Sequence, residues 1–404
     1  MPRIALNIIC KNENHIILRM LGSVRPIIDL IVAVDTGSSD KTISTIKEFG
    51  SSAGIPSFVF ERPFDNFCNS RNYALDKLHN VVAELGWLPA EVWGLIVDCD
   101  EVLQISDKFA KGQLETDLYL VAVKREEEIT VRRALFKLSG GFRWESPVHE
   151  MIVWKDVAIT VSGMRELFIK YETKGASWKG NLEKKFLNYV RILLEHEAEG
   201  HSDCRTLYNI GDSYMAAADC CKSKNKAREY RLAAKKYYIT ALNLTEIGVQ
   251  EKVIISQHLA ESMDFLKEEW PKTQELLLSA YSLYMQKAES LAEIIRHYMT
   301  AKKWNIAYLF SSFAYKECNG RPPALDVIGG MININLYEWE LLLYYSICCY
   351  FTGRGQEAKM LRKQLMHYVL THMDNFTIKD LILIQYNSPF YLAVRSLKRR
   401  LRHQ

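Results

Sequence analysis

The N-terminal part of the chain alternates between strand-like and helix-like segments. Apolar runs at residues 4–10, 30–34, 56–60 and 95–97 predict buried strands, and the stretches between the first three carry helical patterns. This alternation is typical of βαβ units, in which helices cover a mostly parallel sheet. We therefore expect an N-terminal α/β domain, with antiparallel strands added to its sheet after residue 118.

Polar side chains gather where these predicted strands end. Glu13 follows the first strand, Asp35 ends the second, and Asp98 and Asp100 follow the strand at 95–97. The carboxyl ends of parallel strands meet at one edge, where open α/β sheets bind ligands. Carboxylate oxygens suit Mg²⁺ or Mn²⁺ that also holds phosphate oxygens, so we expect a metal–diphosphate site. The alternatives are an acidic surface turn after the last strand and a capping role for Asp35.

Three arginines are candidates for binding a diphosphate, because a guanidinium can grip it with two hydrogen bonds. Arg71 lies in the predicted helix after residue 64, where the alternative is an ion pair with Asp65 or Asp76. Arg132 and Arg133 are adjacent in a predicted strand and so face opposite sides of the sheet. One of these two is expected to be structural.

His149 and several glutamates complete the set of candidate site residues. His149 is a candidate third metal ligand, since imidazole suits Mn²⁺ better than Mg²⁺, and the alternative is a hydrogen-bonded histidine at a strand end. Glu150, Glu101 and Glu145 are candidates for a general base, with Glu150 preferred. The sequence alone does not choose among them.

From about residue 177 onwards, helical periodicity replaces the strand signals. Leu207, Ile210, Gly211 and Tyr214 have the spacing found in the first helix of a tetratricopeptide repeat. A generic helical bundle is the alternative. We expect an α/β domain over residues 1–155, connecting strands or a linker over 156–176, and a tetratricopeptide-like helical domain over 177–404.

Two further features of the helical half allow more than one interpretation. Aromatic residues within it are expected to be core residues, with a peptide-binding groove as the alternative: Tyr337, Trp339, Tyr344 and Tyr345. The basic tail at 396–404 is expected to be a solvated helix end, with anionic membrane contact as the alternative.

Composition excludes several classes of protein. A net charge of +4 over 404 residues does not suggest nucleic-acid binding, and the length suggests two domains. The nine cysteines are poorly spaced for zinc or disulfides, so we expect reduced thiols. The sequence has no apolar run long enough for a transmembrane segment and no signal-peptide pattern at its start, so we expect a cytoplasmic protein.

Three motifs together resemble the family 2 glycosyltransferases, which have the GT-A fold. They are residues 8–13 (IICKNE), 34–42 (VDTGSSDKT) and 97–101 (VDCDE). Residues 64–72 and 144–150 resemble a subgroup in which the transferase is fused to tetratricopeptide-like helices. That subgroup includes peptide S-glycosyltransferases of bacteria and viruses and lipopolysaccharide-core glucosyltransferases. The resemblance is specific over residues 4–150 and mainly architectural over 177–404.

The resemblance implies a role for each matching residue. Glu13 and Asp35 would contact uridine, Asp98 and Asp100 would bind ribose, diphosphate and metal, and His149 would belong to the metal or phosphate shell. The Gln-x-x-Arg-Trp box of processive synthases is absent, which argues against polysaccharide synthesis and leaves the base unassigned.

We therefore expect a metal-dependent hexosyltransferase that moves a single sugar from a UDP-sugar to a protein, peptide or glycan, with inversion. The helical half would present the acceptor or mediate homodimerisation. One alternative is a nucleotidyltransferase, although residues 11–14 offer no glycine-rich phosphate loop. The other is a non-catalytic helical-repeat scaffold whose nucleotide-sugar-binding domain has degenerated.

Overall fold

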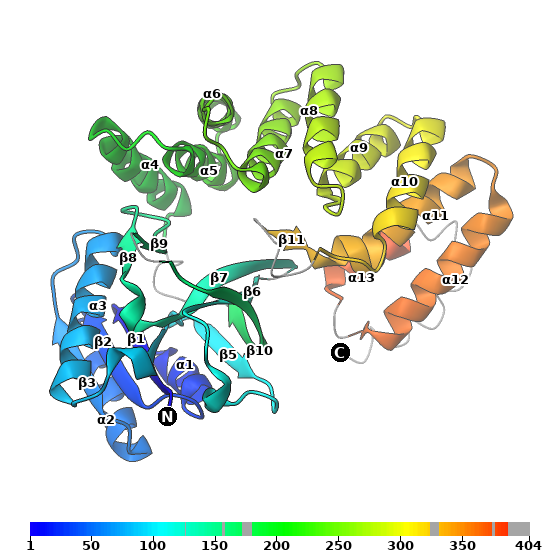
Figure 1. The fold of residues 1–404 in the computed structure, drawn as a ribbon. Coiled ribbons are helices and arrows are strands. Elements are labelled where there is room, and N and C mark those ends of the chain that lie inside the picture. The colour runs from blue at the N-terminus through cyan, green and yellow to red at the C-terminus, as the bar shows by residue number, and fades with distance from the viewer. Residues whose placement is uncertain (126, 156–157, 172–179, 324–330, 374–375, 387–404) are drawn as a thin grey trace. The chain divides into compact units, whose positions relative to one another are not determined.

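The computed structural model describes residues 1–125, 127–155, 158–171, 180–323, 331–373 and 376–386 (Figure 1). The chain forms two compact units. The first is built mainly from Met1–Glu268, and the second from Glu269–Pro323 together with the described residues from Ile332 on. The first unit contains a large sheet and its flanking helices, and the second is mostly helical.

The main sheet of the first unit has the strand order β3-β2-β1-β4-β7-β6-β10-β5. Strands β3, β2, β1 and β4 run parallel to one another, and β6 is parallel to β10. Strand β7 is antiparallel to β4 and β6, and β5 is antiparallel to β10. The strands are β1 (Arg3–Cys10), β2 (Leu30–Asp35), β3 (Ser57–Glu61), β4 (Val92–Leu95), β5 (Glu101–Ile105), β6 (Leu118–Arg125), β7 (Glu128–Lys137) and β10 (Val161–Tyr171), with β8 (Phe142–Glu145) and β9 (Met151–Trp154) forming a separate hairpin.

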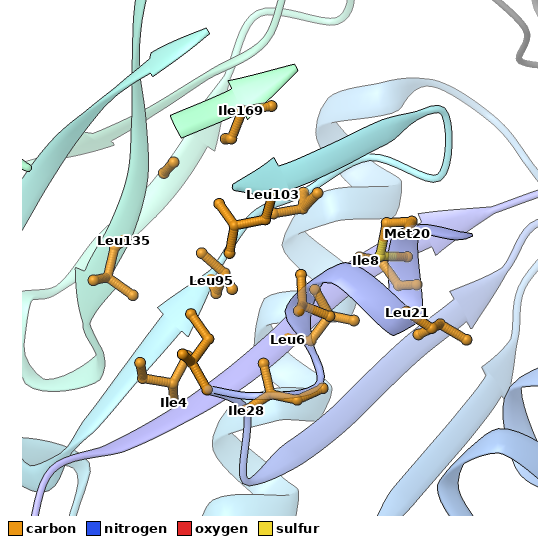
Figure 2. Close-up of a cluster of buried hydrophobic side chains, with 14 of the residues drawn as sticks. Ile4, Leu6, Ile8, Met20, Leu21, Ile28, Leu95, Leu103, Leu135 and Ile169 are labelled. Carbon is orange, nitrogen blue, oxygen red and sulfur yellow. The ribbon is translucent and has the colours of Figure 1, made fainter. Parts of the chain in front are cut away.

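Helices pack on both faces of the parallel strands because these strands alternate two apolar faces. Ile4, Leu6 and Ile8 of β1 point to one face, where they join Met20 and Leu21 of α1 (Ile17–Val24) in one core (Figure 2). Helix α2 (Thr42–Ala53) contributes Ile46 to the same core. The opposite face, which includes Ala5, packs against α3 (Phe67–Glu84). Burial on both faces explains why these strands are nearly continuous apolar runs.

Helices occupy most of the described chain after residue 181. The first unit holds α4 (Leu182–Ala198), α5 (Cys204–Cys220), α6 (Lys224–Leu242) and α7 (Val249–Phe265). The second holds α8 (Trp270–Leu283), α9 (Glu289–Thr300), α10 (Trp304–Cys318), α11 (Leu341–Phe351), α12 (Gly355–Thr371) and α13 (Ile378–Tyr386). Shorter elements are the 3-10 turns Pro89–Glu91, Lys111–Gln113 and Leu138–Gly140, the two-residue strand β11 (Ile332–Asn333) and the π-helical turn Leu336–Glu340.

Helices α5 and α6 approach closely because glycine lies at their contact. A Cβ atom on Gly211 would meet the ring of Tyr238 at 2.5 Å. Tyr238 is fully buried, as are Ala217 and Ala234. Small residues at the predicted spacing therefore do bring this helix pair together, although the assignment to tetratricopeptide repeats stays a prediction.

The expected fold class, an α/β domain followed by helices, is confirmed. The aromatic residues at 337, 339, 344 and 345 are buried, so the core interpretation holds for them. All nine cysteines are free thiols, as expected. Among the described residues, no helix combines the length and apolar character that crossing a membrane requires. The basic tail at 396–404 lies outside the described residues.

Candidate functional site

The loops after β1 and β2 are tied together at one edge of the sheet. Cys10 and Asp35 are neighbours in the parallel register of these strands. Beyond them, the backbone N–H of Asn12 donates to Ser38 Oγ at 2.8 Å, and that of Glu13 donates to Thr42 Oγ1 at 2.9 Å. The loop that carries Glu13 is therefore fixed to the turn that follows Asp35.

Asp35 holds this turn from within. Its Oδ1 accepts hydrogen bonds from the N–H groups of Gly37 at 2.9 Å and Ser38 at 2.7 Å, and the residue is only 1% exposed. Asp40 caps the following helix separately, by accepting from the N–H and hydroxyl of Thr42. The capping role considered for Asp35 is thus observed, and its other oxygen, Oδ2, accepts from the thiol of Cys10 at 3.8 Å.

Arg71 lies at the centre of a carboxylate cluster formed by distant parts of the chain. Its Nε donates to Glu150 Oε1 at 2.6 Å and its Nη2 donates to Asp98 Oδ1 at 2.9 Å. Its guanidinium also lies over the ring of Trp144, 4.8 Å from the ring centre. Burial alone would lower the pKa of Arg71, but the two carboxylates outweigh burial and raise it. Arg71 therefore stays charged and orients both acids.

The two acids considered as ion-pair partners of Arg71 pair with other arginines in the structure. Asp65 pairs with Arg62 at 2.9 Å, and Asp76 pairs with the exposed Arg143. Arg71 does form ion pairs, but with Asp98 and Glu150 of the candidate site and not with Asp65 or Asp76.

Arg132 and Glu101 form a further ion pair of the cluster. The two terminal nitrogens of Arg132 donate to the two carboxylate oxygens of Glu101, each at 2.7 Å. Glu101 is fully buried, and its Oε2 also accepts from the backbone N–H of Asp98 at 2.8 Å. Arg132 Nη1 lies 3.8 Å from Asp98 Oδ2. Glu101 is thus committed to fixing Arg132 and the chain at Asp98.

Arg133 faces away from this cluster, as the alternation of the strand predicts. Its Nη1 donates to the carbonyl of Ile152 at 2.9 Å, and its guanidinium lies over the ring of Trp154. Of the two adjacent arginines, Arg132 belongs to the site and Arg133 holds the β8–β9 hairpin.

Asp100 is surrounded by other acids. Burial, followed by the charges of Asp98 and Glu101, raises the pKa of Asp100 to about 7, and Glu13 adds to the effect. By contrast, Arg71 and Arg132 outweigh the effect of burial on Asp98 and lower its pKa. The two acids of the predicted metal site therefore differ: two arginines lower the pKa of Asp98, whereas burial and neighbouring acids dominate at Asp100, although Lys185 also acts on it electrostatically. A divalent cation fits such a carboxyl, because it supplies the missing positive charge.

His149 lies where the hairpin loop meets the helices. Its backbone has a left-handed φ of 54°, and its carbonyl accepts from Arg205 Nη2 at 2.8 Å. Its Nε2 lies 3.3 Å from Ser213 Oγ, and its ring packs edge-on against Tyr189. Burial of the ring lowers the pKa of His149, although the residue as a whole is exposed.

The structure brings most of the predicted site residues together, but not all of them. Glu13 acts electrostatically on Asp100, and Asp98 contacts both Arg71 and Arg132. Within the described residues, the ligand atoms of Asp98, Asp100 and His149 do not form a group close enough to share one ion. The hydrogen-bonded alternative for His149 is therefore the one observed, and its role as a ligand stays a prediction.

The three candidate bases occupy different environments. Glu145 is half exposed and pairs with Lys155 at the surface, at 2.6 Å. Glu101 is fully buried against Arg132. Glu150 lies between these extremes, with a side chain 13% exposed and held by Arg71. Glu150 is thus the only one of the three that is both positioned by the cluster and partly open to solvent.

The sequence did not point to three residues that the structure places beside the site. Arg19 of α1 donates to the backbone carbonyl of Asp100 at 3.3 Å. Tyr189 and Ser213 contact His149 from α4 and α5. Arg19 had a weak signal, as a cation in the helix directly after the first strand. The other two had none, because their partner lies far away in the sequence.

No protein-family model matches this chain, and no curated protein matches it either. Among solved structures, S. aureus TarS 1–349 with UDP is 12% identical with a TM-score of 0.29, covering 78% of this chain and 92% of TarS 1–349. The complex of the same protein with UDP-GlcNAc is 14% identical with a TM-score of 0.30 and the same coverage. Acl4, an assembly chaperone of RpL4, is 10% identical with a TM-score of 0.26, covering 55% of this chain and 94% of the other. TM-scores this low carry no argument about activity.

The raised pKa of Asp100 predicts that metal binding depends on pH. Only the ionised carboxyl is a ligand, so the apparent Mn²⁺ affinity should fall by about tenfold for each pH unit below about 7. Its folded pKa exceeds its unfolded value, so this group's contribution to stability is greatest at low pH and falls as pH rises to about 7. Calorimetric titration with Mn²⁺ and UDP at several pH values measures the first effect. An affinity that stays constant from about pH 5.5 to about pH 8 would contradict it.

Proposed function

We propose that this chain is a metal-dependent glycosyltransferase that moves one sugar from a UDP-sugar to a protein, peptide or glycan acceptor. The observation that carries the proposal is that two neighbouring acids at the sheet edge differ: Asp98 is ion-paired with Arg71, whereas burial and nearby acids raise the pKa of Asp100 to about 7. Such an edge suits a nucleotide diphosphate, because its phosphates and a cation would complete the charge balance. The resemblance of residues 4–150 to family 2 glycosyltransferases supports the same assignment.

Asp100 and Asp98 are the residues that would hold Mn²⁺ or Mg²⁺. When bound, the ion would act as a Lewis acid and neutralise charge on the departing UDP. Asp98 and Asp100 differ in role, since Asp98 is held in one orientation by Arg71 and Arg132. Asp100 is the acid with the raised pKa, so its ionised form would gain most from a bound cation.

Two other residues at the edge would position the nucleotide. Asp35 is almost fully buried and shapes the turn through Gly37 and Ser38, so we assign it to fixing the uridine pocket. Glu13 is carried by a loop that is tied to the same turn through Thr42. In the proposed site, both would contact or border the uridine.

Glu150 is the general base in this proposal. Its carboxylate would take the proton of the acceptor while the acceptor atom bonds to the anomeric carbon and the bond from that carbon to UDP breaks. This in-line displacement inverts the anomeric centre. Arg71 orients Glu150 through a 2.6 Å hydrogen bond, and Glu101 is a positioning residue for Arg132.

Binding of metal and nucleotide together tests the proposal. Two carboxylates alone bind Mn²⁺ weakly, so UDP should raise the Mn²⁺ affinity of the chain by at least about tenfold in calorimetric titrations. A screen for released UDP across common UDP-sugars and GDP-sugars then identifies the donor. Equal Mn²⁺ affinity with and without UDP, together with no hydrolysis of any donor, would instead favour a non-catalytic scaffold.

A further inference from the structure

Helix α4 ends in a defined backbone motif that folds the chain back on itself. The N–H of Gly200 donates to the carbonyl of Glu197 at 3.0 Å, and the N–H of His201 donates to that of His196 at 3.3 Å. Gly200 has a φ of +103°, in the left-handed region. This pair of bonds is the Schellman motif, in which the N–H of the second residue after the C-cap donates to a carbonyl of the last helical turn.

The motif brings three metal-binding side chains together. His196 lies on the last turn of α4, Glu199 caps the helix, and His201 follows the glycine. The rings of His196 and His201 stack with their centres 4.1 Å apart and their planes 13° apart. One ligand atom from each of the three residues lies within 4.8 Å of the others. The backbone thus brings two imidazoles and one carboxylate close together, and the stacked rings must turn for their nitrogens to converge on one ion.

The donor set indicates the class of ion. Two imidazole nitrogens suit Zn²⁺, Cu²⁺ or Ni²⁺ and do not suit Mg²⁺ or Ca²⁺, which prefer oxygen. A site with two histidines and one glutamate is a known zinc combination that leaves a position for water. The carbonyls at the C-terminus of α4 carry partial negative charge, which also favours a cation there. Glu199 and His201 are exposed, so their side chains can turn to share one ion.

We propose that His196, Glu199 and His201 form a binding site for a transition-metal cation, with Zn²⁺ as the best fit. The site is separate from the acids at the sheet edge, and it does not depend on the proposed transferase activity. The ion would fix the end of α4 to the segment that leads into α5. Leu193 of α4 and Ile210 of α5 share one core with Val148, so the site would stabilise the helix pair that packs on the hairpin loop.

Zinc titration of the tag-free full chain tests this site. We expect one zinc ion per chain with a Kd of about 1 μM or lower, and a rise in Tm when zinc is added. His196→Gln and His201→Gln should each weaken binding by at least about tenfold and abolish the rise in Tm. Gly200→Ala should also weaken it, because alanine is strained at a φ of +103°.

Two controls separate this site from other binding. His367→Gln removes an exposed histidine on α12 and should leave zinc binding unchanged. The titrations are repeated with Asp100→Asn, which lacks the acid proposed to bind metal at the sheet edge. Zinc binding at His196 and His201 should be unchanged in this variant. Circular dichroism of each variant without zinc confirms that it is folded. Zinc affinity that is the same in His196→Gln as in the unaltered chain, or no binding in either, would overturn the proposal.

Discussion

Replacing Asp100 by asparagine should reduce sugar transfer by about a hundredfold or more while leaving the protein folded. The amide keeps the shape of the side chain but loses the charge that would hold the ion. Asp100 lies among acids that raise its pKa to about 7, so removing its charge relieves repulsion in the metal-free protein. The Tm at pH 8 should therefore stay the same or rise slightly. Release of UDP and thermal melting measure the two effects.

A matched variant makes the result for Asp100 specific. Asp107 is an exposed acid in the segment after β5, so Asp107→Asn changes the net charge equally without touching the cluster. This variant should transfer sugar at the rate of the unaltered chain. If Asp100→Asn kept full activity, Asp100 would have no role in the transfer. If the variant lowered the Tm strongly, Asp100 would have a structural role.

Replacing Arg71 by leucine should destabilise the protein by about 3 kcal/mol, because it leaves the partly buried Glu150 and Asp98 without their closest cation. Arg71 is 8% exposed and forms close ion pairs with both Asp98 and Glu150. The variant should also lose sugar transfer, since both acids lose their orientation. Arg71→Lys keeps the charge but not the planar guanidinium, so its free energy of unfolding should lie between those of the unaltered chain and Arg71→Leu. Urea unfolding gives the differences in free energy.

Arg143 offers the control for this experiment. It pairs with Asp76 at the surface, where the two side chains are 57% and 52% exposed. Exposed pairs contribute little, so Arg143→Leu should change the free energy of unfolding by no more than about 1 kcal/mol. Equal destabilisation by Arg71→Leu and Arg143→Leu would show that the buried cluster does not stabilise the fold.

The sequence predicted the strands best where burial leaves a clear signal. Strands β1 and β2 lie within one residue of the predicted runs, because both of their faces are covered. The predicted strand at 95–97 is shifted, since β4 ends at Leu95 and the chain turns at Cys99 and Asp100, where the N–H of Glu101 donates to the carbonyl of Asp98 at 3.0 Å. Boundaries of this kind depend on the neighbouring strand: β4 pairs with β7 only as far as Leu95, and beyond it a backbone hydrogen bond joins Ile96 to Ala134.

The candidate site was predicted as a set of residues but not as a set of contacts. Alternation along β7 predicted that only one of Arg132 and Arg133 would face the site, but it could not tell which one. The partner of Arg71 lies 79 residues away at Glu150, and that of His149 lies 64 residues away at Ser213. Such pairings depend on how the hairpin and the helices fold onto the sheet, which no local pattern records.

The position of β10 affects how this chain can fold during synthesis. Strand β5 emerges from the ribosome early, yet its neighbour in the sheet spans Val161–Tyr171 and is made much later. Until then β5 has an open edge, which can pair wrongly with another strand. A chain cut at residue 155 would keep that edge exposed permanently, so soluble expression of the α/β part alone should require residues up to at least Tyr171.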